Sequence, residues 1–374
     1  PSRTSAKERK RKTTKMARER VIVGMSGGVD SSVAAWLLKE QGYEVIGVTM
    51  QIWQEDEERD QEEGGCCGLS AVEDARRVAR LLDIPYYVMN FKEAFKKSVM
   101  DYFAREYLAG RTPNPCIACN RRVKWEALLG RARALGADYI ATGHYARIDR
   151  LPNGRYAVRN SVTAEKDQTY ALYSLTQDQL RHTLMPVGAY TKPEIRKMAE
   201  NLHLPVAAKK DSQEICFIPD KDYAGFIEKY TGIRSPEGNF VTKDGKILGR
   251  HKGITHYTVG QRRGLGLPMG RRVFVQEIRP AANEVVIGEG SQVFSDSLEA
   301  DQVNYMAVPE PAVGESGRYT AKIRYGHRGA ACTVTRVGED RIRCEFDEPV
   351  RAVTPGQAVV FYRDGCVAGG GTIL

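Results

Sequence analysis

The sequence predicts an α/β protein with a parallel-sheet N-terminal domain followed by two small β-barrel-like domains. Over about the first 215 residues, short apolar strands alternate with amphipathic helices, which is typical of a parallel sheet covered on both faces. After about residue 219 helical periodicity largely disappears and short β segments appear between turn signals, as in small barrels. At 374 residues the chain is also too long for one ordinary domain.

The N-terminal elements follow from apolar runs and helix signals. Strands are expected at residues 21–25, 44–52, 85–91 and 138–143, and helices at 32–41, 94–108 and 121–135. Two more helices should begin with capping boxes, in which a Ser or Thr and a Glu three residues later satisfy backbone donors. The first is Ser70 with Glu73, and the second is Thr191 with Glu194, where Pro193 stands at the start of the helix.

The C-terminal part reads as β modules. Residues 332–337 and 341–346 alternate in polarity across a tight turn, which predicts a hairpin. We divide the chain into a basic tail at 1–18, an α/β catalytic domain at 19–218, a central β domain at 219–290 and a C-terminal β-barrel at 291–374.

Composition indicates a globular cytoplasmic protein. The hydrophobic fraction of 42% and charged fraction of 28% are ordinary, and no apolar run approaches the roughly 18 residues of a membrane span. No secretory signal is visible, so the eight cysteines do not suggest a disulfide framework.

The charge is concentrated at the N-terminus. Of the net charge of +9, residues 1–15 contribute seven Lys/Arg against one Glu. This predicts a disordered, solvated arm, with an arm that touches RNA as the alternative. Met16 is a candidate natural start, and the acidic stretch 54–65 is expected to be a solvated loop.

A glycine-rich loop follows the first strand and runs directly into a helix. Gly27 and Gly28 let the backbone approach a phosphate, and the N–H groups of Ser31 and Ser32 stand at a helix N-terminus, which favours an anion. Asp30 would repel phosphate, so we expect it to hold Mg²⁺ on a pyrophosphate. No lysine closes this loop, which distinguishes it from GxxxxGK[ST]. The alternative is a glycine turn that only links strand to helix.

Three cysteines occupy informative positions. Cys116 and Cys119 are expected in a proline-rigidified loop just before a helix, whose dipole and the following Arg121 and Arg122 would favour the thiolate. A structural zinc pair would need two more ligands, and no second CxxC or HxxxH occurs. Cys216 follows two lysines and a polar stretch, which suggests a site facing an anionic substrate.

The loop SGGVDS resembles that of the PP-loop ATP-pyrophosphatases, which split ATP between the α and β phosphates and adenylate a carbonyl-type oxygen. Across residues 20–374 the chain closely resembles the tRNA-specific 2-thiouridylases. The motifs that carry this resemblance are GMSGGVDSSVAAWLL, GRTPNPCIACNRRVKW, DYIATGHYARI, KDQTYALY, KKDSQEICFI, YTVGQRRGLG and VTPGQAVVFY.

The resemblance implies roles for individual residues. Cys119 matches the nucleophile, and Cys216 matches the cysteine that carries persulfide sulfur. ATP would bind to Gly24, Met25, Ser26, Gly27, Gly28, Val29, Asp30, Ser31, Met50 and Gly143. Contacts with tRNA, including its target base, would come from Asn114, Pro115, Cys116, His144, Lys166, Asp167, Gln168, Arg324, Tyr325 and Gln357.

The implied activity is ATP-dependent 2-thiolation of the wobble uridine in the anticodon loop of tRNA. Adenylation makes the oxygen a good leaving group, a persulfide attacks the carbon, and a second thiol releases the sulfur by forming a disulfide. ATP, Mg²⁺ and a sulfur-relay or cysteine desulfurase protein are the expected cofactors and partners, and no membrane is expected.

Three alternatives stay open at this point. Many family members carry Asp where this chain has Cys116, so Cys116, Cys119 and Cys216 could instead ligate an iron–sulfur cluster. Another adenylating enzyme, of the lysidine or GMP synthetase type, would need no cysteine pair. An RNA-binding module without catalysis is the third alternative.

Overall fold

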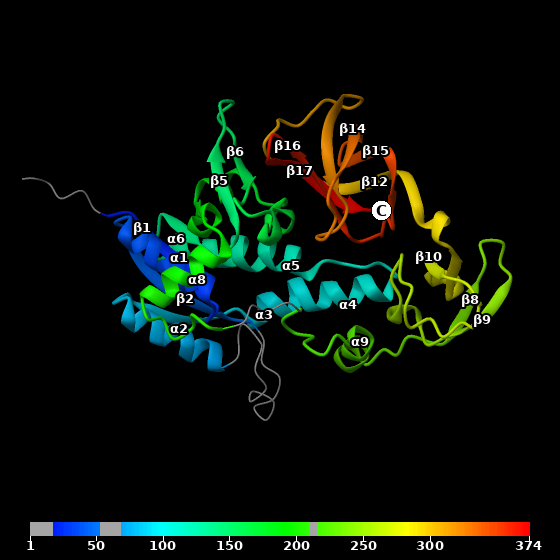
Figure 1. Ribbon diagram of the computed structural model, residues 1–374, viewed down its shortest axis with the longest axis horizontal. Coiled ribbons are helices and arrows are strands. Elements are labelled where there is room, and N and C mark those ends of the chain that lie inside the picture. The colour runs from blue at the N-terminus through cyan, green and yellow to red at the C-terminus, as the bar shows by residue number, and fades with distance from the viewer. Residues whose placement is uncertain (1–17, 53–68, 210–214) are drawn as a thin grey trace, which may run out of the picture.

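The computed structural model describes residues 18–52, 69–209 and 215–374. The molecule is elongated, with the parallel sheet and its helices at one end, a β-barrel beside them and a smaller β-sheet at the far end (Figure 1). The predicted tail up to residue 17 and the predicted acidic loop 54–65 lie outside the described residues. The α/β class with two following β domains is confirmed.

Five parallel strands form the N-terminal sheet in the order β3-β2-β1-β4-β7. Their bounds are β1 Arg20–Gly24, β2 Glu44–Gln51, β3 Tyr86–Asn90, β4 Tyr139–Ala141 and β7 Thr183–Leu184. β1 is buried on both faces, since Val21, Ile22 and Val23 are fully enclosed. From β1 the chain continues to β2 and β3 on one side of the sheet, and β4 and β7 lie on the other side. The strand order therefore reverses between β1 and β4, and in open α/β sheets ligands bind at the carboxyl ends of the strands at such a point.

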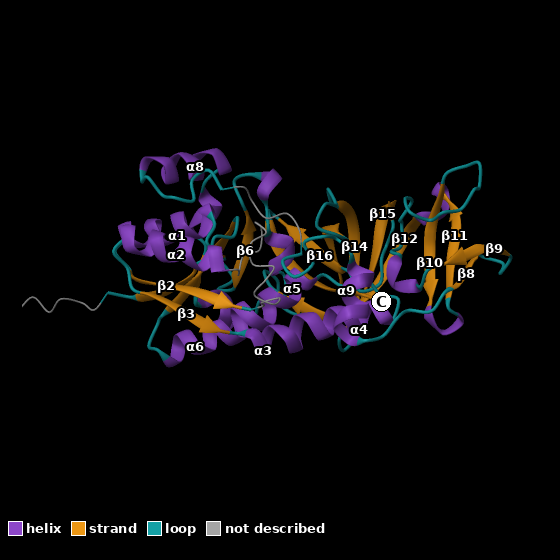
Figure 2. Cartoon of the chain, turned by 90° about the horizontal axis from the view of Figure 1, so that it is seen from below, coloured by secondary structure: helices purple, strands orange, loops and turns teal. Residues whose placement is uncertain are grey.

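Helices cover both faces of this sheet (Figure 2). On one face lie α1 Val29–Glu40, α2 Leu69–Leu81 and α8 Lys192–Asn201, and on the other lie α3 Lys92–Phe95 and α6 Leu129–Ala134. α4 Asp101–Leu108 extends beyond the sheet, under the barrel (Figure 1). β1 serves both cores, because Val21 and Val23 pack on the α1 side and Ile22 packs on the α3 side.

Two of the predicted helices differ from their expected form. The helix predicted at 94–108 consists of α3, a π-helical stretch Lys96–Met100 and α4. The helix predicted at 121–135 begins much earlier, with α5 Pro115–Ala118, continues as a π-helical stretch Cys119–Leu128 and ends with α6. The prediction that Cys116 and Cys119 lie in a loop before the helix is therefore wrong. Pro is favoured in a first helical turn, and the helix begins there.

One of the two predicted capping boxes is present. The Thr191 N–H donates to Glu194 Oε2 over 2.7 Å at the start of α8, and Pro193 lies in the first turn. α2 begins at Leu69, so Ser70 lies inside the first turn and is not the N-cap.

Six antiparallel strands close the C-terminal barrel. They pair in the order β12-β15-β14-β13-β16-β17, and β17 pairs back to β12. Their bounds are β12 Phe294–Tyr305, β13 Ser316–Lys322, β14 Ala330–Gly338, β15 Arg341–Arg351, β16 Ala358–Arg363 and β17 Cys366–Ile373. The predicted hairpin is β14 with β15, in which Cys332 faces Phe346 and Val334 faces Cys344.

A hairpin from the N-terminal part extends the barrel sheet, and the sequence analysis did not predict it. β5 Ala146–Arg150 pairs with β6 Tyr156–Asn160, and β6 meets β17 where Arg159 faces Cys366. A single helix, α9 Tyr223–Thr231, precedes the central sheet and was also missed. That sheet has the order β10-β11-β8-β9, with β8 Gly238–Val241, β9 Ile247–His251, β10 Val273–Arg279 and β11 Glu284–Glu289.

The remaining regular segments are short. They are α7 Gln177–Arg181 and the 3₁₀ turns Ala164–Lys166, Thr169–Leu172, Pro186–Ala189, Ile254–His256, Pro280–Ala282 and Gly290–Val293. Among the residues that the structure describes, no helix has the length and apolar character to cross a bilayer.

Candidate active site

The loop between β1 and α1 has a conformation that its glycines permit. Gly27 has a φ of +68°, and a Cβ at this position would lie 2.3 Å from the Ala71 carbonyl oxygen in α2. Gly28 is the N-cap of α1, with an extended backbone. The Ser32 hydroxyl donates to the Gly28 carbonyl over 2.8 Å, and the Ser26 N–H donates to Ser31 Oγ over 3.2 Å. The loop is therefore tied to the first turn of the helix whose N–H groups it presents.

The carboxyl end of β4 packs directly on this turn. A Cβ on Gly143 would lie 2.6 Å from the Ser31 nitrogen and 2.8 Å from the Asp30 carbonyl carbon, so only glycine allows the approach. Met50, at the carboxyl end of β2, pairs with Met89 of β3 and is partly buried. The structure thus brings Gly143 and the loop together at the point where the strand order reverses, with Met50 at the same edge of the sheet.

Asp30 carries the negative charge of the loop, and two other side chains hold it. The Lys192 ammonium lies 2.8 Å from Asp30 Oδ1 and 2.9 Å from Oδ2, and the Tyr145 hydroxyl donates to Oδ1 over 2.8 Å. Both donors were missed in the sequence, where Lys192 is an ordinary first-turn lysine far from the loop. A single carboxylate on this loop suits Mg²⁺, which usually binds through one or two carboxylates together with substrate phosphates.

Cys116 and Cys119 stand on the continuous helix formed by α5, the π-helical stretch Cys119–Leu128 and α6, which we call the cysteine helix. This helix begins with a capped turn. Asn114 Oδ1 accepts hydrogen bonds from the backbone N–H groups of Cys116 and Ile117, over 3.1 and 3.3 Å, and Pro115 is buried in the first turn. Cys116 is exposed and Cys119 is half-buried. Arg122 pairs with Glu126 at 2.8 Å, so part of the positive charge expected near the thiols is already neutralised.

Cys216 is fixed through its neighbour. The Phe217 ring lies 5.6 Å from that of Phe95 and 5.5 Å from that of Phe103, in edge-to-face arrangements. Cys216 and Cys119 are both partly buried against the same hydrophobic core cluster, which includes these rings. Two cysteines from distant parts of the sequence therefore border one core.

The three cysteines do not form a metal ligand set in this conformation. Within residues 18–52, 69–209 and 215–374, no three His, Cys, Asp or Glu side chains are grouped so that they could hold a metal ion. The assignment of Cys116, Cys119 and Cys216 to an iron–sulfur cluster, which is normally held by converging thiolates, stays a prediction.

His144 follows β4 and is partly buried. Its Nδ1 is 2.7 Å from the Thr142 hydroxyl, and its ring lies 5.7 Å from the Trp125 ring. Burial, and secondly the charge of Lys124, hold the pKa of His144 well below its ordinary value. The imidazole is therefore neutral at pH 7 and offers a hydrogen bond, not a charge.

The predicted RNA residues of segment 166–168 organise their own loop. Asp167 Oδ2 accepts from the Ser161 N–H over 2.9 Å, and Gln168 Oε1 accepts from the Tyr145 N–H over 2.9 Å. Lys166 lies beside them in a short 3₁₀ turn. Asp167 and Gln168 use these hydrogen bonds to hold the conformation of their own segment. Their contact with RNA stays a prediction.

The barrel contributes three predicted RNA residues, which the structure places differently. Arg324 donates to the Arg351 carbonyl over 2.9 Å, and Gln357 donates to the Thr112 carbonyl over 3.0 Å, next to the cysteine helix. Tyr325 is half-exposed. The pKa of its hydroxyl is raised by burial and by the charge of Asp167, with smaller influences from Lys166 and Cys116. The loop at Tyr325 therefore lies within electrostatic reach of segment 166–167 and of Cys116.

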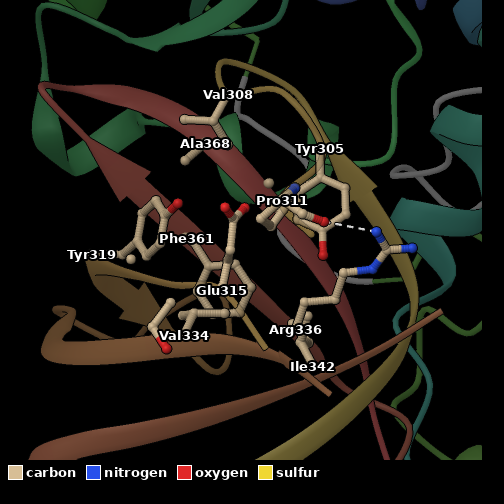
Figure 3. A pocket seen from close by; sticks show the side chains of 13 residues that line it. Tyr305, Val308, Pro311, Glu315, Tyr319, Val334, Arg336, Ile342, Phe361 and Ala368 are labelled. Carbon is tan, nitrogen blue, oxygen red and sulfur yellow. Dashed lines mark hydrogen bonds between the residues drawn. The ribbon is translucent and has the colours of Figure 1, made fainter. Parts of the chain in front are cut away.

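The barrel also encloses a cavity of about 340 Å³, away from these residues. Tyr305, Tyr319 and Phe361 line it together with Glu315 and Arg336 (Figure 3). The Arg336 guanidinium is engaged, since it donates to the Pro311 carbonyl over 2.7 Å. None of the predicted site residues lines this cavity.

Three family models match the chain. Residues 19–220 match the tRNA methyl transferase HUP domain, residues 224–289 the tRNA methyl transferase PRC-barrel domain and residues 295–373 the aminomethyltransferase beta-barrel domain. The first of these covers more than half of the chain.

Curated relatives match over nearly the whole length. The tRNA-specific 2-thiouridylase MnmA of Lachnoclostridium phytofermentans is 66% identical over 95% of this chain and 99% of the relative. The proteins of the same name from Clostridium kluyveri and Clostridium perfringens are 56% and 54% identical, over 95% and 96% of this chain and 99% of each relative. The descriptions of the family models mention methyl transfer, whereas the names of the relatives mention thiolation. The relatives are the more specific guide, because they are highly identical to this chain over almost its whole length.

Proposed function

Because this chain belongs to the tRNA-specific 2-thiouridylase family, we propose that it replaces the 2-oxygen of the wobble uridine of tRNA with sulfur in the cytoplasm, at the expense of ATP. The chain is a sulfurtransferase enzyme, as its relatives are. A lysidine or GMP synthetase and an RNA-binding module without catalysis, both open on the sequence alone, are thereby excluded.

The proposed ATP site is supported by the packing of Gly143, just after β4, against the glycine loop. ATP binds along Gly24–Ser31, with Gly143 against the first turn of α1 and Met50 against the adenine. The close approach at Gly143 and the left-handed Gly27 are the observations that support this arrangement. Asp30 would hold Mg²⁺ on the pyrophosphate, where the cation offsets the charge of the leaving group.

The sulfur half rests on Cys119 and Cys216, which border one core. The uridine 2-oxygen attacks the α-phosphorus of ATP, and pyrophosphate leaves. The terminal sulfur of a Cys216 persulfide attacks C2, and AMP leaves with the oxygen. The Cys119 thiolate then attacks the Cys216 sulfur, which forms a disulfide and frees the thiocarbonyl. A thiol reductant restores both thiols, and a sulfur-relay or cysteine desulfurase protein reloads Cys216.

The RNA half rests on the segments around Cys116. Gln357 donates to the Thr112 carbonyl, just before the cysteine helix, and Tyr325 lies within electrostatic reach of Lys166, Asp167 and Cys116. We propose that the target base enters there, at Asn114, Pro115 and Cys116, and that His144, Gln168, Arg324 and Gln357 contact the anticodon loop around it. A splayed-out single-stranded base is the usual target of such mixed aromatic and basic surfaces.

The test is a reconstituted reaction. The purified chain is incubated with a tRNA transcript, MgATP and a persulfide donor, and the nucleosides are analysed by mass spectrometry alongside AMP and pyrophosphate. We expect one AMP and one pyrophosphate for each 2-thiouridine, and no product from Cys119→Ser or Cys216→Ser. Cys366→Ala, in the barrel sheet, is the matched cysteine control and should keep full activity. Product formed without either Cys119 or Cys216 would contradict the persulfide cycle.

The iron–sulfur alternative has its own measurement. Iron and acid-labile sulfide are determined in protein purified without oxygen, and the turnover of Cys116→Ser is compared with that of the unaltered chain. The persulfide cycle requires iron-free protein that is active, and it assigns Cys116 no covalent step. Stoichiometric iron together with an inactive Cys116→Ser variant would replace the persulfide cycle with a cluster.

A further inference from the structure

A lysine stands at the phosphate loop even though the loop sequence contains none. Lys192, in the first turn of α8, is 9% exposed and lies 2.8 and 2.9 Å from the two carboxylate oxygens of Asp30. Its ammonium is also 5.8 Å from the centre of the Tyr145 ring, a distance at which a cation is attracted to the ring face. A lysine in a glycine-rich phosphate loop is normally part of the loop itself and reaches the β and γ phosphates.

The packing of α8 fixes the position of this side chain. The backbone of Thr191 and the side chain of Glu194 hold the first residue of α8, and Ile195 and Ala199 are fully buried in the core that α8 shares with α1. The N-terminal turn of α8 is thereby held against the N-terminal turn of α1. A rigid anchor of this kind positions the ammonium with little side-chain entropy left to lose on binding.

The charges of the pair match those of magnesium-bound pyrophosphate. An ammonium suits phosphate oxygens, and a carboxylate suits Mg²⁺. Removing two charges from water is costly, and a buried ion pair adds little net stability compared with apolar residues of similar size. Fastening α8 to α1 is therefore a weak reason to bury a lysine here, and a ligand that needs both charges is a stronger one.

We propose that Lys192 is the lysine of this phosphate loop: its ammonium binds the pyrophosphate portion of ATP, and Asp30 holds it in place for that contact. The inference rests on the proposed function for the identity of the nucleotide, and it adds a binding residue to that site. The role is a direct contact with phosphate, so it differs from a purely structural tie between α8 and α1.

Binding measurements on the full-length chain without tRNA or sulfur donor test this contact. Lys192→Met should weaken the affinity for MgATP and for magnesium pyrophosphate by tenfold or more, as expected for a lost charge-assisted hydrogen bond of about 1.5–3 kcal/mol. AMP, which has no pyrophosphate, should bind as before. Lys192→Arg should recover part of the loss. Lys197→Met, which removes the same charge from the exposed face of α8, is the matched control and should change nothing.

A double-mutant cycle separates a direct contact from positioning of Asp30. In an Asp30→Asn background, where the amide keeps an acceptor for Tyr145, Lys192→Met should still lower MgATP affinity about fivefold or more. No further loss in that background would mean that Lys192 acts only by holding Asp30, and would overturn the proposal. Thermal unfolding of each variant shows whether it is folded; if Lys192→Met is not, Lys192→Arg and the double variant carry the comparison.

The outcomes separate this inference from the proposed function. Normal thiolation with unchanged MgATP affinity in Lys192→Met would overturn the inference alone. Lys192-dependent binding of MgATP in a chain that makes no 2-thiouridine would uphold it while the proposed function fails. An unaltered chain that does not bind MgATP would overturn both.

Discussion

Single side chains in this protein often perform a local structural task at the positions assigned to RNA. Arg324 uses one guanidinium nitrogen to bind the Arg351 carbonyl, and Asp167 uses Oδ2 to accept from the Ser161 N–H. An arginine has five donors, so a backbone contact leaves others for a phosphate. The Asp167 carboxylate accepts hydrogen bonds from Asn160, Ser161 and Thr169, so it has less capacity left to contact RNA. At this scale Arg324 is the better candidate for a measurable contribution to RNA affinity.

Arg324→Ala should weaken tRNA binding and lower the slope of log K against log salt by about 1, because one phosphate contact and its released counterion are lost. MgATP affinity should hardly change, since the phosphate loop is on another domain. Filter binding at several salt concentrations gives the slope. Arg328→Ala removes an exposed arginine of the same loop and shows how much of the effect comes from the loss of any positive charge there. An unaltered slope for Arg324→Ala would show that Arg324 does not contact a phosphate.

The partly buried His144 predicts a specific dependence of stability on pH. Its pKa is lowered by burial and by Lys124, so the unfolded chain takes up a proton near pH 6.5 while the folded chain does not. This contribution destabilises the fold as pH falls through about 6.5 and stops growing below the folded pKa. Above pH 6.5 it vanishes.

The comparison is between the unaltered chain and His144→Gln. Denaturant unfolding at about pH 7.5, 6 and 5 should show a shallower loss of unfolding free energy in the variant, by up to about 1.4 kcal/mol per pH unit. The other histidines are present in both proteins, so the difference isolates His144. Equal slopes would show that His144 takes up a proton in the folded chain at the same pH as in the unfolded chain.

Among the elements, the cysteine helix carries two cysteines of the proposed site within about a turn of its N-cap. Its N-cap Asn114 satisfies the N–H groups of Cys116 and Ile117 through Oδ1. The π-helical stretch that follows, Cys119–Leu128, begins at the second cysteine, and such stretches often occur at functional sites. The geometry of both thiols therefore depends on how this helix begins.

Asn114→Ala should lower the free energy of unfolding by about 1 kcal/mol, the usual loss when a polar N-cap is removed. Asn114→Asp keeps the acceptor and should restore stability. Thiolation measured in the same variants separates the two roles of the residue. If Asn114→Asp is both stable and fully active, the amide nitrogen makes no contact with the base; stability without activity would indicate that it does.

At the scale of the whole molecule, the barrel is docked onto the N-terminal domain by hydrogen bonds to its main-chain carbonyls. Arg155 donates to the carbonyls of Met306 and Tyr305, each over 2.7 Å, and the Thr112 N–H donates to the Pro355 carbonyl over 2.8 Å. The β5–β6 hairpin adds its edge to β17. These contacts hold the barrel against the N-terminal domain.

Arg155→Ala should loosen this docking. Two charge-assisted bonds to carbonyls are lost, so we expect a destabilisation of about 2 kcal/mol and weaker tRNA binding, with MgATP affinity preserved. Arg150→Ala, at the exposed end of β5, is the control. Denaturant unfolding, tRNA filter binding and MgATP binding are measured on both variants. A parallel loss of MgATP affinity would show that the contact supports the whole fold and not the docking of the barrel.

Patterns within a few residues predicted most of the elements. The apolar runs located β1, β2, β3 and β4, the alternation at 332–346 located the β14–β15 hairpin, and Thr191 with Glu194 located the start of α8. Such features depend on neighbours in the chain, so periodicity and capping chemistry reveal them. The two-residue β7 was missed because only its pairing with β4 defines it. The β5–β6 hairpin and α9 were missed although both carry local signals: a tight turn at 151–155, and caps at Asp222 and Gly232.

The sequence by itself determined the family and the position of the glycine loop, and it predicted Cys119 and Cys216 as the reacting cysteines, because each of these is encoded in a short continuous motif. Only the tertiary structure decided that Cys116 and Cys119 stand on a helix, that Cys119 and Cys216 border one core, and that Lys192 and Tyr145 hold Asp30. Lys192 and Asp30 are far apart along the chain, and their pairing depends on α8 packing against α1. Contacts of that kind follow from how buried surfaces fit together, and no local pattern encodes them.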